Sequence, residues 1–558
     1  MDPIIGIDLG TTNSTVTSID SEGKTTVIKN QYGEFITPSA VYFTDQIGKV
    51  IVGKEAKKMS AEDPNNLVMF VKREMGKSKD EVRFDKIERE AKPYDFWGKR
   101  LSPEEISAYI LGQLKQDAER ALNRPVKKAV ITCPAYFGQK EKEATRVAGE
   151  MAGFEVLDVL PEPTAAAFKY SAVSNKDKEN IFVFDLGGGT FDVTILTLER
   201  TPKGMEIKTV KTDGDRKLGG IDWDKNLDGY MREQFYKKFH QNMDYESGPE
   251  AEITLGKLVL DCERAKKDLY KEGANETSIT MEYRGGVITE TITRAQYEAI
   301  TELSTNRCKV YCDNILKEAG MSWNDIDTVL MVGSMSNCGS VQNALRRWSG
   351  RDISFGFINP KTCVSEGAAI CAFLHEGGTT VKTLKDNPNY DKIEEGFCLA
   401  EDVSKAEESG ERVETKIAFA TNVISSSIRL KGFFKGTPTA KLFLEKNTTY
   451  PTSKSFKIPI GRDDLSEVKL EILEGETDNP ANCIVLGDAL LPLRGSHTKE
   501  DLVEVTIKVD NNGIIQTEGV DLKTGEKVDA VIRRQGALSK EEIDKAKDVI
   551  EDMFTLTF

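Results

Sequence analysis

The sequence is poor in the residues that define several protein classes. Only 9 cysteines and 3 histidines occur among its 558 residues. The cysteines are odd in number and show no short paired spacing, which argues against a secreted disulfide scaffold and for a cytoplasmic protein with reduced thiols. His240, His375 and His497 are so scattered along the chain that the sequence predicts neither a zinc site nor a histidine-based catalytic triad.

Long apolar runs are also missing. No run reaches the roughly 18 residues that a membrane span needs, and the N-terminus passes straight into an apolar strand without the features of a signal peptide. We therefore expect no membrane contact. Acidic residues outnumber basic ones by 91 to 76, which leaves a net charge of -15. A field of this sign repels phosphate backbones, so we expect no nucleic-acid partner.

The chain is too long for one compact core, since domains average about 150 residues. Through residue 376, apolar strands alternate with amphipathic helices, a pattern typical of an α/β domain. The strongest signals are a strand at 128–134, a helix at 141–151 and a helix after Ser102, whose capping box with Glu105 marks the start. We therefore place one α/β domain at 1–376.

The remaining third of the chain has a different character. Residues 377–415 are rich in Gly, Lys, Asp, Glu and Ser, which predicts a polar linker. From 416 to 536 apolar residues alternate with polar ones, most regularly at 503–509, which predicts an all-β domain. Residues 537–558 predict a single short helix with a capping box at Ser539.

Two segments of the α/β domain are near copies of each other. Ile-Gly-Ile-Asp-Leu-Gly-Thr-Thr surrounds Asp8, and Val-Phe-Asp-Leu-Gly-Gly-Gly-Thr surrounds Asp185, 177 residues (185 − 8) further on. In both, an apolar strand runs into Gly and Thr. We interpret this as an internal duplication that places one phosphate-binding hairpin in each half of the domain.

These hairpins carry the residue types that ATP binding requires. ATP needs amides or hydroxyls around its phosphates and carboxylates that hold hydrated magnesium. Asp8 with Thr11 and Thr12, facing Asp185 with Thr190, could supply both, and the glycines between would let the backbone approach the phosphates. The alternative is that each Asp-Leu-Gly is only a turn after a strand, and the presence of two copies weighs against it.

The two hairpin sequences closely resemble the heat shock protein 70 family, the DnaK-type chaperones. Further resembling segments lie at 63–73, 132–137, 162–167, 214–224 and 262–266. The resemblance covers essentially all of 4–376, and more loosely 446–452 and 509–514. It implies an α/β actin-like ATPase domain, a duplicated ribonuclease H-like fold, followed by a substrate-binding β-sandwich.

The resemblance also implies roles for individual residues. Lys72 would reach the γ-phosphate and the attacking water, although a Lys beside an Arg is otherwise often solvent-exposed. Glu162 would orient that water or the magnesium shell, and Asp185 would accept the proton. Thr190 would bond the γ-phosphate, while Asp8, Asp185 and Asp192 would hold cations and their waters.

The remaining nucleotide contacts implied by the resemblance come from several short segments. They are Gly10, Thr11, Thr12, Asn13, Gly187, Gly188, Gly189, Gly219, Gly220, Glu263, Lys266, Lys267, Tyr270, Gly333, Ser334 and Asn337. The implied cofactors are ATP or ADP, Mg²⁺ and K⁺. The implied partners are unfolded or extended polypeptides, a J-domain co-chaperone and a nucleotide exchange factor.

The sequence departs from the family pattern where adenosine would bind. Ser334 replaces a glycine, and Asn337 replaces the Arg that lies against adenine in the family. Across the pocket Lys267 replaces an Arg and Tyr270 a Ser, while Lys361 stands where an Asp is usual. Tyr270 is a candidate to stack on the base, although packing is the commoner role of a helical Tyr. We expect nucleotide binding that is weaker or less selective for adenine.

Features that couple the two domains in the family also differ. Pro134 and Lys142 match the region that relays the nucleotide state, with Lys in place of the usual Arg. The acidic-flanked leucine run of the family linker has no counterpart in 377–415, where Leu384, Phe397 and Leu399 are the nearest apolar residues. Only 24 residues follow Arg534, so we expect no helical lid.

Three functions remain open at this point. The first is an ATP-hydrolysing chaperone that uses its nucleotide state to bind and release unfolded segments, as in stress response and protein folding. The second is a divergent nucleotide-binding scaffold or co-chaperone of the same fold with little turnover. The third, a small-molecule kinase on the related fold, is disfavoured by the chaperone-like inserts and the β-rich C-terminal region.

Overall fold

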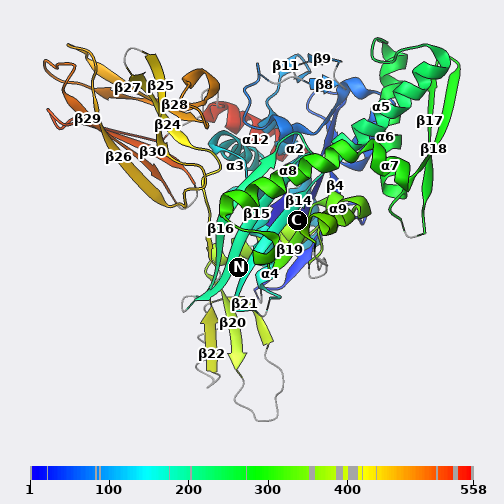
Figure 1. The fold of residues 1–558 in the computed structure, drawn as a ribbon, viewed down its shortest axis with the longest axis horizontal. Helices are drawn as coiled ribbons and strands as arrows, with labels where there is room; N and C mark the ends of the chain where they lie inside the picture. The colour runs from blue at the N-terminus through cyan, green and yellow to red at the C-terminus, as the bar shows by residue number, and fades with distance from the viewer. Residues whose placement is uncertain are drawn as a thin grey trace.

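The structure is a computed structural model of the chain. It describes residues 3–554 except 22, 82–83, 87–88, 93, 175, 202–203, 272, 351–357, 385–393, 400–411, 417–418, 435–436, 511–512 and 532–537. Figure 1 shows the fold.

The α/β part, through α10, contains nineteen strands in the described residues, together with most of the helices. The strands are β1 (Ile4–Asp8), β2 (Asn13–Ile19), β3 (Thr25–Val27), β4 (Thr37–Pro38), β5 (Ala40–Phe43), β6 (Val50–Val52), β7 (Leu67–Met69), β8 (Phe84–Lys86), β9 (Arg89–Lys92), β10 (Asp95–Phe96), β11 (Lys99–Arg100), β12 (Lys128–Cys133), β13 (Glu155–Pro161), β14 (Lys178–Leu186), β15 (Phe191–Thr201), β16 (Gly204–Asp215), β17 (Glu276–Tyr283), β18 (Gly286–Thr293) and β19 (Thr328–Val332). The helices are α1 (Lys54–Lys58), α2 (Pro103–Leu122), α3 (Gln139–Met151), α4 (Glu162–Ser171), α5 (Gly220–Phe239), α6 (Pro249–Asp268), α7 (Arg294–Ile300), α8 (Glu302–Ala319), α9 (Gly339–Ser349) and α10 (Cys363–His375), with short 3₁₀ turns η1 (Met59–Ala61), η2 (Pro64–Asn66), η3 (Val71–Glu74), η4 (Trp323–Asp325) and η5 (Ser334–Asn337).

The C-terminal part is almost entirely strand. Its elements are β20 (Gly378–Leu384), β21 (Glu394–Leu399), β22 (Arg412–Lys416), β23 (Phe419–Thr421), β24 (Ile428–Phe434), β25 (Thr437–Leu444), β26 (Thr452–Pro459), β27 (Glu467–Glu474), η6 (Pro480–Asn482), β28 (Ile484–Pro492), β29 (Leu502–Val509), β30 (Ile515–Asp521), β31 (Lys527–Val531) and α12 (Lys540–Phe554).

Two mixed sheets form the centre of the α/β part. The first has the order β13-β12-β1-β2-β3, and the second β19-β14-β15-β16-β23. In the first, β1 pairs parallel with β12 and antiparallel with β2. In the second, β14 pairs parallel with β19 and antiparallel with β15. The strand arrangement is therefore repeated, with Asp8 and Asp185 at equivalent strand ends, as the near-copied segments predict.

Helix α10 packs against the first sheet and against α4, and both helices share one apolar core with strands of the two sheets. Helix α10 approaches β1 and α4 closely because glycines lie at both contacts. A Cβ on Gly6 would lie 2.0 Å from the Ala369 nitrogen, and one on Gly367 would lie 1.7 Å from the Ala165 oxygen. Distances under 3.0 Å cannot be accommodated against backbone, so glycine is required at both positions.

The helices and strands with the strongest sequence signals are found where they were predicted. The capping box of Ser102 and Glu105 begins α2, and that of Ser539 and Glu542 begins α12. Strand β12, helix α3 and strand β29 match the predicted segments within two residues.

The predicted polar linker contains more structure than its composition suggests. Within its described residues, β20, β21 and β22 form a three-stranded sheet that projects from the body of the molecule (Figure 1). Beyond residue 416, the first strand, β23, pairs parallel with β16 of the second central sheet rather than with the β-rich region. That region begins in space at β24 and contains two four-stranded sheets, β25-β24-β27-β28 and β26-β29-β30-β31, around a shared core.

The β-rich region and α12 both contact the α/β part. Ser425 Oγ donates a hydrogen bond to the Phe137 carbonyl at 2.9 Å, and Lys446 lies 3.2 Å from Asp213. Helix α12 packs on α2 and α3 of the α/β part (Figure 1). In the described part of the chain, no helix combines the length and the apolar character that crossing a bilayer demands.

Candidate active site

The two copied hairpins meet at their turns. A Cβ built on Gly188 would lie 1.9 Å from Thr12 Oγ1, and one on Gly189 would lie 2.2 Å from Thr11 Cγ2. The glycines are therefore needed for the contact itself. Asp8 and Asp185 line one small cavity of about 70 Å³ between the hairpins, so the facing arrangement predicted from the sequence is present.

Lys72 and Glu162 lie in the same cavity, at the start of η3 and at the first residue of α4. The Lys72 ammonium is 2.5 Å from Glu162 Oε1, and both side chains are almost fully buried, at 5% and 8% exposure. The alternative of a solvent-exposed Lys72 is therefore wrong. Asp192 lies opposite Asp185 in the β14–β15 ladder and is buried, but it lines neither this cavity nor the larger one next to it.

The site holds more acidic than basic groups. Burial, together with the charge of Glu162, raises the pKa of Asp8 to about 7 and raises the pKa values of Asp185 and Asp192 well above their ordinary range. Burial opposes the charged form of Lys72 as well, but Glu162 and Asp8 outweigh it and raise the pKa of the ammonium. Asp8, Asp185 and Glu162 thus lie at one cavity with the buried Lys72, and Asp192 is buried close to them; this excess of acidic groups favours a bound cation.

The residues present fit a hydrated magnesium ion and phosphates. All the candidate metal ligands of the carboxyl cluster are oxygens, the ligand type that Mg²⁺ prefers. Mg²⁺ keeps several of its waters when a protein binds it, and one or two carboxylates are then enough to hold it. Asp8 and Asp185 would hold such an ion at the cavity, with Asp192 behind them. Thr11 Oγ1 is buried and has no hydrogen-bond partner among the described residues, which leaves it available to a phosphate oxygen.

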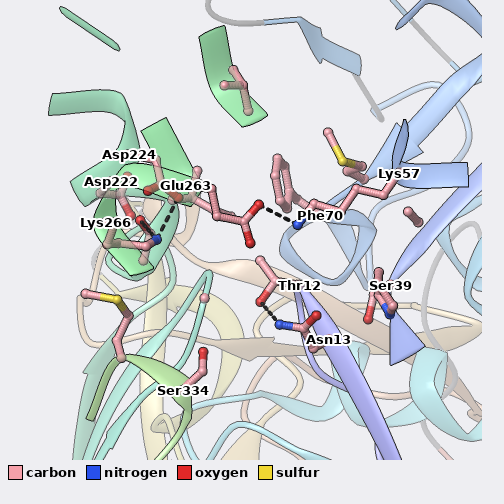
Figure 2. Close-up of a pocket in the computed structure, with 18 of the residues that line it drawn as sticks. Thr12, Asn13, Ser39, Lys57, Phe70, Asp222, Asp224, Glu263, Lys266 and Ser334 are labelled. Atoms are coloured by element: carbon pink, nitrogen blue, oxygen red, sulfur yellow. Dashed lines mark hydrogen bonds and ion pairs between the residues drawn. The ribbon is translucent and has the colours of Figure 1, made fainter. Parts of the chain in front are cut away.

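A second cavity of about 880 Å³ adjoins the first (Figure 2). Six residues line both cavities: Thr12, Asn13, Ile36, Gly188, Ser334 and Lys361. The larger cavity is also lined by most residues predicted for the adenosine end, namely Gly220, Glu263, Lys266, Lys267, Tyr270 and Asn337. One continuous cleft thus joins the carboxylate cluster to the predicted nucleoside pocket.

Of the seven predicted glycines, Gly188 lines both cavities and Gly220 the larger one, and the other five differ in role. Gly10, Gly187 and Gly333 line the small cavity with Thr190. Gly189 and Gly219 line neither cavity, and a Cβ on Gly219 would lie 2.5 Å from the Gly189 nitrogen. These two glycines serve the packing of the hairpin against the start of α5.

Charged pairs join the walls of the cleft, and the sequence predictions did not include them. Lys57 of α1 bonds to Glu263 of α6 (Figure 2). Glu263 also bonds to Lys267, one helical turn further along α6, at 2.6 Å. Burial alone would raise the pKa of Glu263, but the two ammonium groups lower it to about 2. Lys57 lies in a lysine-rich stretch without a motif, so no sequence signal could have identified it.

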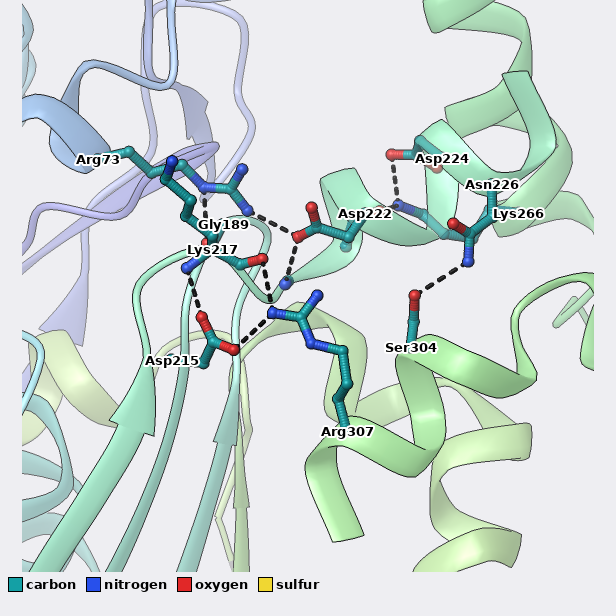
Figure 3. A network of polar contacts seen from close by, with 12 residues as sticks. Arg73, Gly189, Asp215, Lys217, Asp222, Asp224, Asn226, Lys266, Ser304 and Arg307 are labelled. Atoms are coloured by element: carbon teal, nitrogen blue, oxygen red, sulfur yellow. Dashed lines mark hydrogen bonds and ion pairs between the residues drawn. The ribbon is translucent and has the colours of Figure 1, made fainter. Parts of the chain in front are cut away.

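A second pair lies nearer the hairpins. The Arg73 guanidinium contacts Asp222 at 2.8 Å and donates a hydrogen bond to the Gly189 carbonyl at 2.8 Å (Figure 3). Asp222 also accepts from the Gly219 amide at 2.8 Å. Arg73 and Asp222 both lie in segments that resemble the family, and that resemblance was the signal from which they could have been found.

Tyr270 forms part of the wall of the larger cavity. A Cβ on Gly339 would lie 3.2 Å from its ring, and the Arg294 guanidinium lies 5.5 Å from the ring centroid. Its ring also meets Tyr297 edge-on at 5.8 Å. These contacts favour packing over stacking as the role of Tyr270.

The exposed Lys361 lines both cavities and has no ion pair among the residues that the structure describes.

The predicted relay residue Lys142 lies at the contact with the β-rich region. It is buried on α3, and its ammonium lies 5.6 Å from the ring centroid of Tyr450. Near it, a Cβ on Gly138 would lie 2.4 Å from a carboxylate oxygen of Glu474. The start of α3 therefore contacts the β-rich region directly.

A comparison with known families finds a match over most of the chain. The family model described as Hsp70 protein matches residues 4–387 and 420–555. The match covers most of the chain, including both hairpins, the carboxylate cluster and the β-rich region. It leaves out 388–419, where β21 and β22 lie.

Proposed function

This chain belongs to the Hsp70 family, and on that premise we propose that it is an ATP-dependent molecular chaperone. Residues 1–376 would form an actin-like ATPase domain, and the two four-stranded sheets from β24 to β31 a peptide-binding β-sandwich. The chaperone would bind unfolded or extended polypeptide and act with a J-domain co-chaperone and a nucleotide exchange factor in the cytoplasm.

One observation carries the proposal. Two hairpins of the same strand arrangement meet at their turns around a small cavity lined by Asp8, Asp185, Glu162 and the buried Lys72, with the exposed Lys361 as a second lysine in its wall. Such a cavity disfavours an anion on its own because of its carboxylates. A triphosphate that brings its own magnesium is a suitable occupant, because the ion offsets charge on both sides.

The residues suggest a division of work in hydrolysis. Thr11, Thr12 and the hairpin amides would hold the phosphates, and Lys72 would lie near the γ-phosphate, positioned by its bond to Glu162. Asp185 would accept the proton of the attacking water in its ionised form, which a bound cation would favour, because burial and the neighbouring carboxylates otherwise raise its pKa well above the ordinary range. Magnesium, with K⁺ as a further cation, would supply charge neutralisation of the phosphates.

The residues at the predicted adenosine end of the cleft favour weaker or less selective binding of adenine. Asn337 offers an amide where an Arg could stack on the base, and Tyr270 is engaged in packing. Lys267 is paired with Glu263 rather than free to lie against a base. We therefore expect modest discrimination between ATP and GTP.

Single-turnover hydrolysis tests the proposal. The full chain is mixed with MgATP, with and without an unfolded peptide, beside Lys72→Ala. The proposal predicts hydrolysis that the peptide accelerates and that Lys72→Ala reduces by about 10²-fold or more, in the range of losing one charge-stabilising group. Phosphate transfer to a sugar instead of water would contradict it and indicate a kinase.

The altered adenosine end favours a second candidate, a nucleotide-binding scaffold or co-chaperone with little turnover. The same experiment distinguishes the two. Saturable MgATP binding with no hydrolysis above that of Lys72→Ala, with or without peptide, would replace the first proposal with the second.

A further inference from the structure

A mixed group of metal-ligand side chains lies outside the cleft. Cys371 and His375 are one turn apart on α10, and Asp158 faces them from β13. One ligand atom of each lies within 4.8 Å of the other two. The scatter of histidines predicted no zinc site, but the fold brings the C-terminal end of α10 beside β13 and so joins residues more than 200 positions apart. None of the three lines either cavity of the cleft.

The distance between His375 and Asp158 suits two ligands of a shared ion better than a hydrogen bond between them. His375 Nε2 lies 3.7 Å from Asp158 Oδ2, which is longer than a good hydrogen bond. Two nitrogen or oxygen ligands that are each 2.0–2.1 Å from a tetrahedral ion lie about 3.4 Å apart. A movement of a few tenths of an ångström would therefore bring this pair to the separation that a shared ion requires.

The surroundings favour a cation at this point. His375 is the last residue of α10, where the carbonyl end of the helix carries partial negative charge. Cys371 is buried, whereas the His375 side chain is 38% exposed and leaves a route from solvent. The other oxygen of Asp158, Oδ1, accepts a hydrogen bond from the Val159 amide at 2.7 Å, which orients the carboxylate as partners of metal ligands do.

We propose that Asp158, Cys371 and His375 bind one divalent ion of the zinc class, with solvent as the fourth ligand. The combination of thiolate, imidazole and carboxylate suits Zn²⁺ and Co²⁺ and does not suit Mg²⁺, which prefers oxygen. Binding converts the Cys371 thiol to thiolate and releases its proton to solvent, while the imidazole binds in its neutral form.

The bound ion would fasten the last turn of α10 to β13. Asp158 is close enough to Lys142 and Tyr450 to act on them electrostatically, so the ion lies near the contact with the β-rich region. The site needs no nucleotide, and its test is therefore separate from that of the ATPase proposal.

Cobalt titration tests the site directly. Reduced, nucleotide-free full-length protein is titrated with Co²⁺ under anaerobic conditions. We expect one equivalent to produce a thiolate-to-cobalt charge-transfer band in the near ultraviolet with visible bands of low-symmetry four-coordinate Co²⁺, and Zn²⁺ to abolish them. Absence of the charge-transfer band at stoichiometric Co²⁺ would overturn the proposal.

Matched variants assign the signal to these residues. Cys371→Ser should remove the charge-transfer band, and His375→Ala, at a half-exposed position, should weaken Co²⁺ binding at least tenfold. Cys483→Ser and His240→Ala change the same residue types elsewhere and should leave the titration unaltered. A band that persists in Cys371→Ser, or an affinity unchanged in His375→Ala, would overturn the proposal, and unchanged circular dichroism would verify folding of each variant.

Discussion

At the scale of single residues, charge in the cleft determines what the site can bind. The carboxylates of the small cavity repel an anion, and Lys361 at its rim is the kind of cation that attracts one. Lys361 lines both cavities and has no ion pair among the described residues, so no carboxylate competes with a bound phosphate for it.

Replacing Lys361 with Ala should weaken MgATP binding about three- to tenfold at low ionic strength, and less at 0.5 M salt, because salt screens an exposed charge. Isothermal titration calorimetry measures both conditions. Lys499→Ala removes an exposed lysine of the β-rich region and is the matched control. Equal affinities for the Lys361 variant and the control would contradict this role.

Asp8 gives a prediction about pH. Its pKa is about 7 in the folded protein and near 3.8 when exposed, so the folded state binds the extra proton between these values. The contribution of Asp8 to stability therefore falls as the pH rises from about 4 to 7. In metal-free protein, Asp8→Asn should raise the Tm at pH 8 by several degrees, and this gain should shrink toward pH 5.

Differential scanning fluorimetry across pH with EDTA measures this effect. MgATP should reverse the order at pH 8, because Asn is a poorer ligand for the cation than Asp. A Tm difference between wild type and Asp8→Asn that does not vary with pH would show that Asp8 is not the buried acid described above.

The site residues differ in how far the sequence could predict them. Asp8 and Asp185 could be found from the copied segments, and Lys72 from the family resemblance, because each lies within a recognisable pattern. Lys57 could not, since its role depends on Glu263 reaching it across the cleft from a helix some 200 residues away. The Asp158–Cys371–His375 group was missed for the same reason.

At the scale of elements, α12 depends on its packing against α2 and α3. A Cβ on Gly112 would lie 2.6 Å from the Phe554 ring, so the glycine on α2 makes room for that side chain. Phe554 and Ile550 are the two buried residues of α12 within its described range. A helix of 15 residues is marginal alone in water, so this contact maintains it.

Phe554→Ala should release α12 from α2, because the ring supplies much of its apolar contact. We expect amide hydrogens of α12 to exchange at least tenfold faster, as mass spectrometry would measure, and the Tm to fall by a few degrees. Val549→Ala changes an exposed residue of the same helix and is the control. Unchanged exchange in Phe554→Ala would mean that the helix is held elsewhere.

Element prediction succeeded where the signal was local. The capping boxes of α2 and α12 and the alternation of β29 are contained in short stretches of sequence. Strand β23 is only three residues long, Phe-Ala-Thr, and exists because β16 offers it an edge. No local pattern could have placed that strand in the second central sheet.

At the scale of the whole molecule, the start of α3 connects the α/β part with the β-rich region. Glu474 of β27 is buried against Gly138, near Glu141, Lys142 and Arg216. Burial and repulsion from Glu141 raise the pKa of Glu474 to about 7, although Arg216 and Lys142 oppose the shift. Docking of the β-rich region on the start of α3 therefore favours the protonated form of the Glu474 carboxyl.

Because an exposed Glu has a pKa near 4.5, the docked form binds the extra proton between that value and about pH 7. Docking should therefore weaken as the pH rises from about 4.5 to 7 and change little above that. Small-angle X-ray scattering should show a larger radius of gyration at pH 8 than at pH 6, and Glu474→Gln should remove the difference. A wild-type radius that does not change with pH would contradict this account of the contact.

We propose that the two duplicated hairpins close around a magnesium-bound triphosphate in one cleft. Calorimetric titration of the full chain with ATP, with Mg²⁺ and then with EDTA, tests it most directly. The account predicts one site per chain that binds MgATP and loses at least tenfold in affinity without the metal. No saturable binding at millimolar MgATP, or equal binding in EDTA, would contradict it.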